Sequence, residues 1–320
     1  MLEHGGATGS SGAGAALDVE NEGAAVNGGS VLTTVAVIGA GQMGAGIAQT
    51  SAQFGHEVLL SDVDLAISQK AKDGIGKLLA RQVSKQKMTE QDAESLLSRI
   101  TPIADYAPMK DAEFIIEAAT EREEIKLKIF EAASKVLSPT AILASNTSSI
   151  PITRMAASTP NPDRFIGMHF FNPVPVMGLI EVIPGLATSA QTLARTRAYA
   201  ESLNKEVVEA GDDPGFVVNR ILVPMLNEAI FVLGQGMGSI EDIDKGCRIG
   251  LNHPMGPLTL ADFVGLDTLF EIVKVLYNTT GDSKYRPAPL LVKYVEAGWV
   301  GRKVGRGFYD YTGPEPVPTR

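Results

Sequence analysis

A glycine-rich loop constrains the fold of this chain more than any other stretch. The pattern Gly-x-Gly-x-x-Gly occupies residues 39–44, directly after a β-branched run at residues 33–38 that is typical of a buried strand. A helical pattern continues to Phe54, and residues 57–61 form a second expected strand that ends before Asp62. A glycine loop between a strand and a helix is the usual opening of an alternating α/β domain.

Each glycine of this loop has its own role if the loop holds a pyrophosphate. Gly39 allows the tight turn, Gly41 lets the backbone approach the phosphates, and Gly44 lets the helix pack on the strand. The helix N-terminus adds free N–H groups and a positive dipole end, which attract phosphate. The sequence therefore predicts a dinucleotide site that includes Gly39, Gly41, Gln42, Met43 and Gly44.

Asp62 stands at the tip of the second expected strand, where a carboxylate can accept both ribose hydroxyls of an adenosine. The neighbouring sequence offers no Arg or Lys to bind a 2′-phosphate. This combination favours NAD over NADP.

The rest of the chain predicts a Rossmann-like doubly wound parallel sheet followed by an all-α domain. Strands are expected at 114–117 and 141–145, with a helix between them at about 125–136. A break at 212–215 precedes apolar helices, at about 240–249, 258–277 and 290–297. The predicted organisation is a disordered Gly/Ala-rich tail (1–32), an NAD-binding domain (33–213) and a helical dimerisation domain (214–320). These helices carry more apolar residues than the core of one domain needs, which favours a homodimer interface.

Composition excludes several classes of function. A formal net charge of −9 disfavours nucleic acid as a partner, and no apolar run approaches the roughly 18 residues that a membrane span needs. Cys247 is the single cysteine, so neither an internal disulfide nor a cysteine metal cluster is available, and no metal site is expected. Residues 1–32 contain neither Lys nor Arg, which signal and transit peptides require. The expected location is the cytoplasm.

The stretch from Gly167 to Glu181 carries the expected chemistry. Its two prolines prevent a helix, so it predicts a strand, a rigid turn and a second strand that brings Glu181 back beside His169. An imidazole next to a carboxylate keeps one tautomer and serves as a general base. A buried histidine on an apolar strand is the structural alternative.

A basic stretch within residues 65–87 allows two interpretations. It contains six basic residues and only one nearby acid, Asp73. The basic residues are Lys70, Lys72, Lys77, Arg81, Lys85 and Lys87. Several of them share one face of the expected helix. They form either an ordinary solvated surface or a landing surface for a phosphate-rich substrate handle.

Six motifs together resemble the L-3-hydroxyacyl-CoA dehydrogenase family, most closely its single-function bacterial 3-hydroxybutyryl-CoA members. They are the glycine loop (37–48), Ser-Asn-Thr-Ser-Ser (145–149), the histidine motif (167–177), Pro-Gly-Phe-Val-Val-Asn-Arg (214–220), residues 256–267 and Gly-Arg-Gly-Phe-Tyr-Asp-Tyr (305–311). The family joins a Rossmann-like domain to a helical dimerising domain. Gly178 departs from the family pattern, which often has Lys there.

The resemblance implies an NAD-dependent reversible oxidation of an L-3-hydroxyacyl-CoA. It implies that His169 is the catalytic base and Glu181 its partner. Ser148 and Asn219 are expected near the reacting oxygen or thioester. Further contacts with NAD are expected from Glu121, Lys126, Ser148, Asn172 and Lys303, and a contact with CoA from Lys85.

Two alternatives remain open from the sequence. A related dehydrogenase could act on a free hydroxy acid or a sugar acid, because a fold does not determine its substrate. A recruited, NAD-binding structural protein of the crystallin kind is the other, although an intact His–Glu pair disfavours it.

Overall fold

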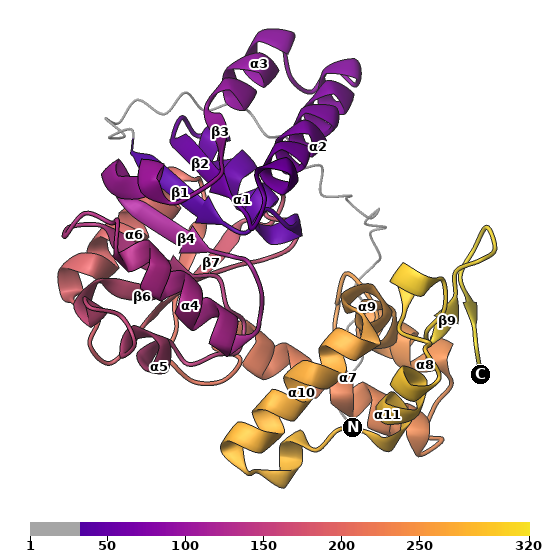
Figure 1. Ribbon diagram of the computed structural model, residues 1–320. Helices are drawn as coiled ribbons and strands as arrows, with labels where there is room; N and C mark the ends of the chain where they lie inside the picture. Colours follow the sequence, from indigo (N-terminus) through magenta and orange to yellow (C-terminus); the bar gives the residue numbers. More distant parts are fainter. Residues whose placement is uncertain (1–32) are drawn as a thin grey trace, which may run out of the picture. The chain divides into compact units, whose positions relative to one another are not determined.

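The computed structural model describes residues 33–320, and the predicted tail at 1–32 lies outside the described residues. An eight-stranded sheet with the order β3-β2-β1-β4-β5-β6-β7-β8 organises the first part of the chain (Figure 1). Its strands are β1 (Thr34–Ile38), β2 (Glu57–Ser61), β3 (Ile100–Ile103), β4 (Phe114–Glu117), β5 (Ile142–Ser145), β6 (Phe165–Phe170), β7 (Leu179–Pro184) and β8 (Glu206–Glu209).

The sheet is parallel from β1 to β6, as the sequence predicts, and it becomes mixed where the hairpin predicted between Gly167 and Glu181 reverses the chain direction. β1 to β6 pair in parallel, but β7 runs antiparallel to β6 and β8 follows the direction of β7. The connection from Phe171 to Gly178 is too short for a helical crossover, so β7 must return beside β6 as a hairpin. The rest of the doubly wound prediction is confirmed.

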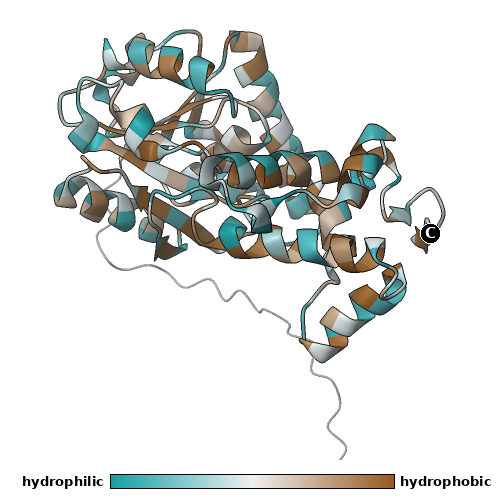
Figure 2. Ribbon diagram, turned by 90° about the horizontal axis from the view of Figure 1, so that it is seen from below, coloured by the Kyte–Doolittle hydropathy of each residue, from teal (hydrophilic) through white to brown (hydrophobic). Residues whose placement is uncertain are grey.

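The sheet is buried on both faces, which explains the continuous apolar strands. Successive residues of β1 enter opposite cores: Val35 and Val37 pack into one cluster, and Ala36 and Ile38 into the other. Figure 2 shows the strands of this sheet as mainly hydrophobic, while the outer helices alternate between polar and apolar residues.

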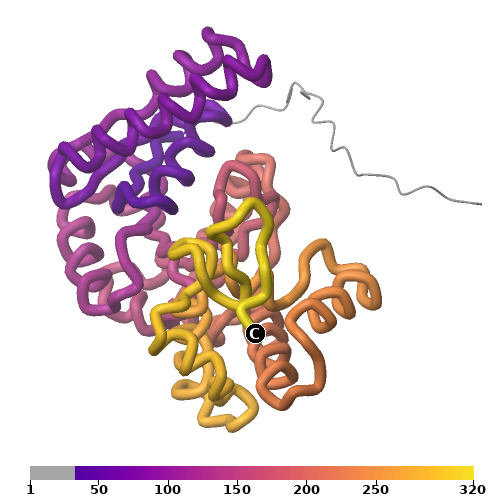
Figure 3. The backbone as a smooth tube through the Cα atoms, turned by 90° about the vertical axis from the view of Figure 1, so that its right-hand side faces the viewer, coloured from indigo at the N-terminus to yellow at the C-terminus, as the bar shows by residue number. Residues whose placement is uncertain are grey.

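The helices of this part are α1 (Gln42–Gln53), α2 (Leu65–Ser84), α3 (Glu90–Ser98), α4 (Glu123–Ser134), α5 (Ile152–Ala156) and α6 (Ala190–Ser202). α2 and α3 form a helical hairpin, drawn in purple in Figure 3. The Thr89 side chain caps α3 by accepting a hydrogen bond from the Asp92 backbone N–H at 3.1 Å.

The following part is helical, with α7 (Val218–Gly234), α8 (Ile240–Lys245), a π turn (Gly246–Gly250), α9 (Pro257–Val264), α10 (Leu266–Thr280) and α11 (Pro289–Glu296). The single helix expected at 258–277 is wrong, because Gly265 adopts a φ of +96° and separates α9 from α10. A small hairpin of β9 (Tyr309–Asp310) and β10 (Val317–Pro318) makes this part less than purely helical. None of the helices described in residues 33–320 is long and apolar enough to cross a membrane.

Candidate active site

The glycine loop has the geometry that a dinucleotide pyrophosphate requires. Gly39 adopts a φ of +102°, and a Cβ there would lie 2.5 Å from the Ala119 Cα. A Cβ on Gly44 would collide with the Gly39 carbonyl oxygen. A Cβ on Gly41, by contrast, would meet nothing within 4 Å, and Gly41 lines a cavity of about 860 Å³. The first and last glycines are therefore fixed by packing, and the middle one leaves the backbone open to a ligand.

Asp62 is held at the tip of β2 by two backbone donors. Its Oδ2 accepts a hydrogen bond from the Ala40 N–H at 2.6 Å, and its Oδ1 accepts one from the Val63 N–H at 2.7 Å. Each carboxylate oxygen keeps a lone pair for a further donor. The carboxylate is thus oriented beside the glycine loop.

His169 and Glu181 face each other across the β6–β7 hairpin. They are register partners in the antiparallel pair, and the His169 Nδ1 lies 2.8 Å from the Glu181 Oε2. Glu181 is fully buried, and His169 retains 7% exposure and lines the cavity. With a carboxylate as the acceptor, Nδ1 carries the proton, which leaves Nε2 as the basic nitrogen.

Glu181 also binds the beginning of α7. Its Oε1 accepts hydrogen bonds from the Val217 and Val218 N–H groups at 3.0 and 2.9 Å. Burial by itself would raise the pKa of Glu181. The hydrogen bonds from His169, Val218 and Val217 outweigh burial and hold the pKa below its ordinary value. Glu181 is therefore kept as a carboxylate beside the imidazole.

The loop between the two strands is fixed from both sides. On one side the Gln42 amide donates to the Asn172 Oδ1 at 3.0 Å. Gly46 leaves room for Val174 on the same side, because a Cβ on Gly46 would lie 2.9 Å from the Val174 side chain. On the other side the Lys205 Nζ donates to the Val174 and Met177 carbonyls at 2.9 and 2.6 Å. Sequence reasoning missed Lys205, since nothing in its local pattern indicates this loop.

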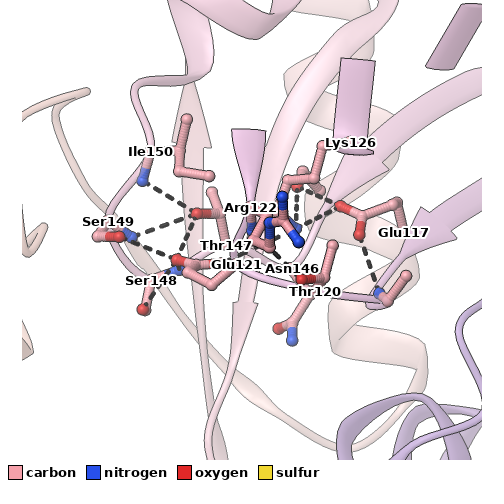
Figure 4. Close-up of polar contacts among 12 residues, drawn as sticks. Glu117, Thr120, Glu121, Arg122, Lys126, Asn146, Thr147, Ser148, Ser149 and Ile150 are labelled. Carbon is pink, nitrogen blue, oxygen red and sulfur yellow. Dashed lines mark hydrogen bonds and ion pairs between the residues drawn. The ribbon is translucent and has the colours of Figure 1, made fainter. Parts of the chain in front are cut away.

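The Glu121 carboxylate accepts hydrogen bonds from several polar groups that follow β5 (Figure 4). Its Oε1 accepts hydrogen bonds from the Ser148 N–H at 2.8 Å and the Ser148 Oγ at 3.1 Å, and also from Thr147 and Ser149. Its Oε2 lies 3.8 Å from the Lys126 Nζ. Glu117 is buried behind Lys126 and forms an ion pair with it, a contact that the sequence did not indicate.

The cavity collects most of the residues that the sequence singled out. Its lining includes the expected residues Gly41, Gln42, Met43, Glu121, Lys126, Ser148, His169, Asn172 and Asn219. Gly39, Gly44, Asp62 and Glu181 support this lining without belonging to it.

Two further expected ligand contacts, Lys85 and Lys303, also lie outside the cavity lining. Lys85 is exposed just past the end of α2. The Lys303 Nζ donates to the Asp267 carboxylate at 2.7 and 2.6 Å, and it is Asp267 that lines the cavity. Burial would raise the pKa of Asp267, but the hydrogen bond from Lys303 leads the interactions that bring it below its ordinary value.

Comparisons with known proteins agree over most of the chain. The family model described as 3-hydroxyacyl-CoA dehydrogenase, NAD binding domain, matches residues 34–213, and the model for the C-terminal domain of 3-hydroxyacyl-CoA dehydrogenase matches residues 215–311. The 3-hydroxybutyryl-CoA dehydrogenase of Bradyrhizobium diazoefficiens is 53% identical over 91% of this chain and 99% of its own. The probable 3-hydroxybutyryl-CoA dehydrogenase of Bacillus subtilis is 51% identical over 87% of this chain and 96% of its own.

A solved structure gives the same result. The crystal structure of (S)-3-hydroxybutyryl-CoA dehydrogenase from Ralstonia eutropha has a TM-score of 0.86 and 49% identity, and the match covers 88% of this chain and all of that one. The chain belongs to the 3-hydroxyacyl-CoA dehydrogenase family.

Proposed function

We propose that this protein is an NAD-dependent dehydrogenase that interconverts an L-3-hydroxyacyl-CoA and the corresponding 3-oxoacyl-CoA, with 3-hydroxybutyryl-CoA as the principal substrate. Relatives at about half identity over nearly their whole length are named for this activity. One observation of the structure supports it most: His169, paired with Glu181, lines the same cavity as Gly41 of the glycine loop.

In the proposed mechanism His169 accepts the proton of the substrate hydroxyl. NAD held by the glycine loop at residues 39–44 would supply the hydride acceptor for C3 of the hydroxyacyl group. The hydroxyl on that carbon must lose its proton as the carbonyl forms, and the Nε2 of His169 accepts it. Glu181 stabilises the resulting imidazolium through the Nδ1 contact of 2.8 Å. In the reverse direction the imidazolium returns the proton to the developing alkoxide.

Other residues of the cavity orient the reactants. The Ser148 hydroxyl and the Asn219 amide line the cavity and supply hydrogen bonds to the reacting oxygen or the thioester. Asn172, positioned by Gln42, borders the nicotinamide and His169. Glu121, which follows β4, and Lys126, in the first turn of α4, contact the cofactor, and Lys303 does so from beside Asp267.

The phosphates of CoA are assigned to the basic surface at the α2–α3 hairpin. Lys70, Lys77, Arg81, Lys85 and Lys87 are all exposed there. An exposed cation adds to affinity by charge attraction, which salt screens. Lys85 belongs to this surface and binds the CoA handle outside the reaction cavity. A homodimer and a cytoplasmic location remain predictions.

The direct test is the initial rate of NADH oxidation with acetoacetyl-CoA, compared with free acetoacetate under the same conditions. We expect turnover of the thioester and much slower turnover of the acid, because the acid lacks the CoA handle. Equal rates would favour a dehydrogenase of a free hydroxy acid. Absence of NADH oxidation with 3-oxoacyl-CoA substrates of several chain lengths would reject the proposed activity.

A further inference from the structure

A buried ion pair lies behind the cavity wall, where β4 and β5 end. The Lys126 Nζ contacts the Glu117 Oε2 at 2.5 Å, and the two side chains are 1% and 0% exposed. The Ser145 hydroxyl donates to the same Oε2 at 2.8 Å, and the Ala119 N–H donates to Oε1 at 2.9 Å. Both oxygens of the Glu117 carboxylate are therefore engaged.

Stability alone does not account for this pair. Two charges removed from water incur a desolvation cost that their attraction seldom exceeds, and apolar side chains of similar volume are often as stable. Lys126 also lies in the first turns of α4, which begins at Glu123, close to the positive end of the helix dipole. Loss of hydration and the positive end of the helix dipole thus both disfavour the charged ammonium, and the negative charge of Glu117 offsets these two effects.

The position of the ammonium supplies a reason for keeping it. Lys126 lines the cavity, and an ammonium has three donors. One donates to Glu117, and a second points to the Ser145 Oγ at 3.4 Å. The remaining donor is available for an acceptor oxygen in the cavity, near the Glu121 carboxylate at 3.8 Å.

We propose that Glu117 is a positioning residue for cofactor binding, which acts by holding the Lys126 ammonium at the cavity wall. The acceptor for Lys126 is a hydroxyl or carbonyl oxygen of the bound dinucleotide. This inference rests on the proposed function, because it takes NAD as the occupant of that part of the cavity. Glu117 itself lies behind Lys126 and does not line the cavity, so it acts on the ligand only through Lys126.

The test is a double-mutant cycle read by the Kd for NADH. Glu117→Gln and Lys126→Met are each expected to raise this Kd by about tenfold, the effect of one lost hydrogen bond to a charged group. In the double variant the Kd should equal that of Lys126→Met alone, because Glu117 acts through Lys126. The KM for acetoacetyl-CoA at saturating NADH should stay within about twofold, which separates this role from a general loss of structure.

The matched control is the exposed pair Glu131–Lys135 at the end of the same helix, with the same charges at 3.0 Å. Glu131→Gln/Lys135→Met should leave the Kd for NADH unchanged. If Glu117→Gln fails to fold, Glu117→Asp retains the charge but withdraws it from Lys126, and it too should raise the Kd.

The outcomes separate this inference from the proposed function. A folded Glu117 variant with the wild-type Kd overturns it, and so do independent, additive effects of the two substitutions. A wild-type protein that binds NADH but does not reduce 3-oxoacyl-CoA rejects the proposed function alone, because the cycle can still be measured by binding.

Discussion

At the scale of single residues, Glu181 connects the chemistry of the site to the stability of the fold. Its carboxylate accepts hydrogen bonds from His169 and from two N–H groups at the start of α7. A single substitution there should therefore change both catalysis and the free energy of unfolding.

Replacing Glu181 with Gln is expected to lower the free energy of unfolding by roughly 1–3 kcal/mol at pH 7. The pKa of Glu181 is depressed from its ordinary value of 4.5, so its contribution is complete above that pH and is lost as the pH falls through the lowered pKa. Urea unfolding of both proteins across the acid range measures this. The difference between them should narrow below pH 4.5, and a difference that is independent of pH would contradict the pairing.

Asp62 should determine the choice between the two nicotinamide cofactors. Asp62→Ser removes the carboxylate that would bind the ribose hydroxyls and the charge that would repel a 2′-phosphate. We expect the KM for NADH to rise by about tenfold and the preference for NADH over NADPH to shrink. Initial rates with both cofactors measure the ratio, and an unchanged ratio would place the discrimination elsewhere.

At the scale of elements, the β6–β7 hairpin depends on a cation from outside it. The Val174 and Met177 carbonyls converge on the Lys205 ammonium, which is 8% exposed. Burial lowers the pKa of Lys205, since no carboxylate appears among its hydrogen-bond partners in the described residues. Lys205 thus stabilises the loop that carries Asn172.

Lys205→Met keeps the length of the side chain but leaves two inward carbonyls without their donor. The free energy of unfolding should fall by roughly 2–4 kcal/mol, and kcat should fall as Asn172 loses its support. Lys293→Met, at an exposed position of α11, serves as the control and should change neither value by much. Wild-type stability in the Lys205 variant would contradict this role.

The sequence predicts elements well where local pattern and tertiary context agree. The glycine loop determines β1, α1 and β2, and the two prolines after His169 indicate the hairpin that brings Glu181 back. β3 is missed because Pro102 interrupts its pattern, and such a strand is tolerated only at the sheet edge, where β3 lies. Gly265 is missed as a helix break, because an isolated glycine inside an apolar periodic stretch is also compatible with a continuous helix.

The parts of the site that the sequence does not predict come from distant segments. Lys205 and Glu117 act through contacts that exist only once the strands are ordered in the sheet. Lys126 and Glu121 were expected from the family resemblance, and no local pattern connects them to Ser145 or Ser148. Motifs indicated His169 and the glycine loop, whereas no local pattern in the sequence indicates the contacts of Lys205 and Glu117.

At the scale of the whole molecule, the helical part has apolar side chains on its surface. The most exposed include Ile221, Met237, Ile249, Leu251 and Phe263, each more than half exposed. Contact with a second chain would remove this exposed apolar surface from water.

A homodimer is expected to cover this surface. Light scattering during size-exclusion chromatography at micromolar concentration should give twice the mass of one chain. The mass of a single chain at that concentration would contradict the homodimer, and the exposed apolar groups would then need another partner.

The central claim is that His169 lies in the same cavity as the bound nicotinamide and exchanges a proton with the oxygen on C3 of the substrate. Single-turnover hydride transfer from prebound NADH to acetoacetyl-CoA tests it most directly, in the wild type and in His169→Gln. The variant should bind NADH with an unchanged Kd and transfer hydride roughly 10²–10⁴ times more slowly, the usual contribution of a general acid or base. Transfer at the wild-type rate in the variant would contradict the claim.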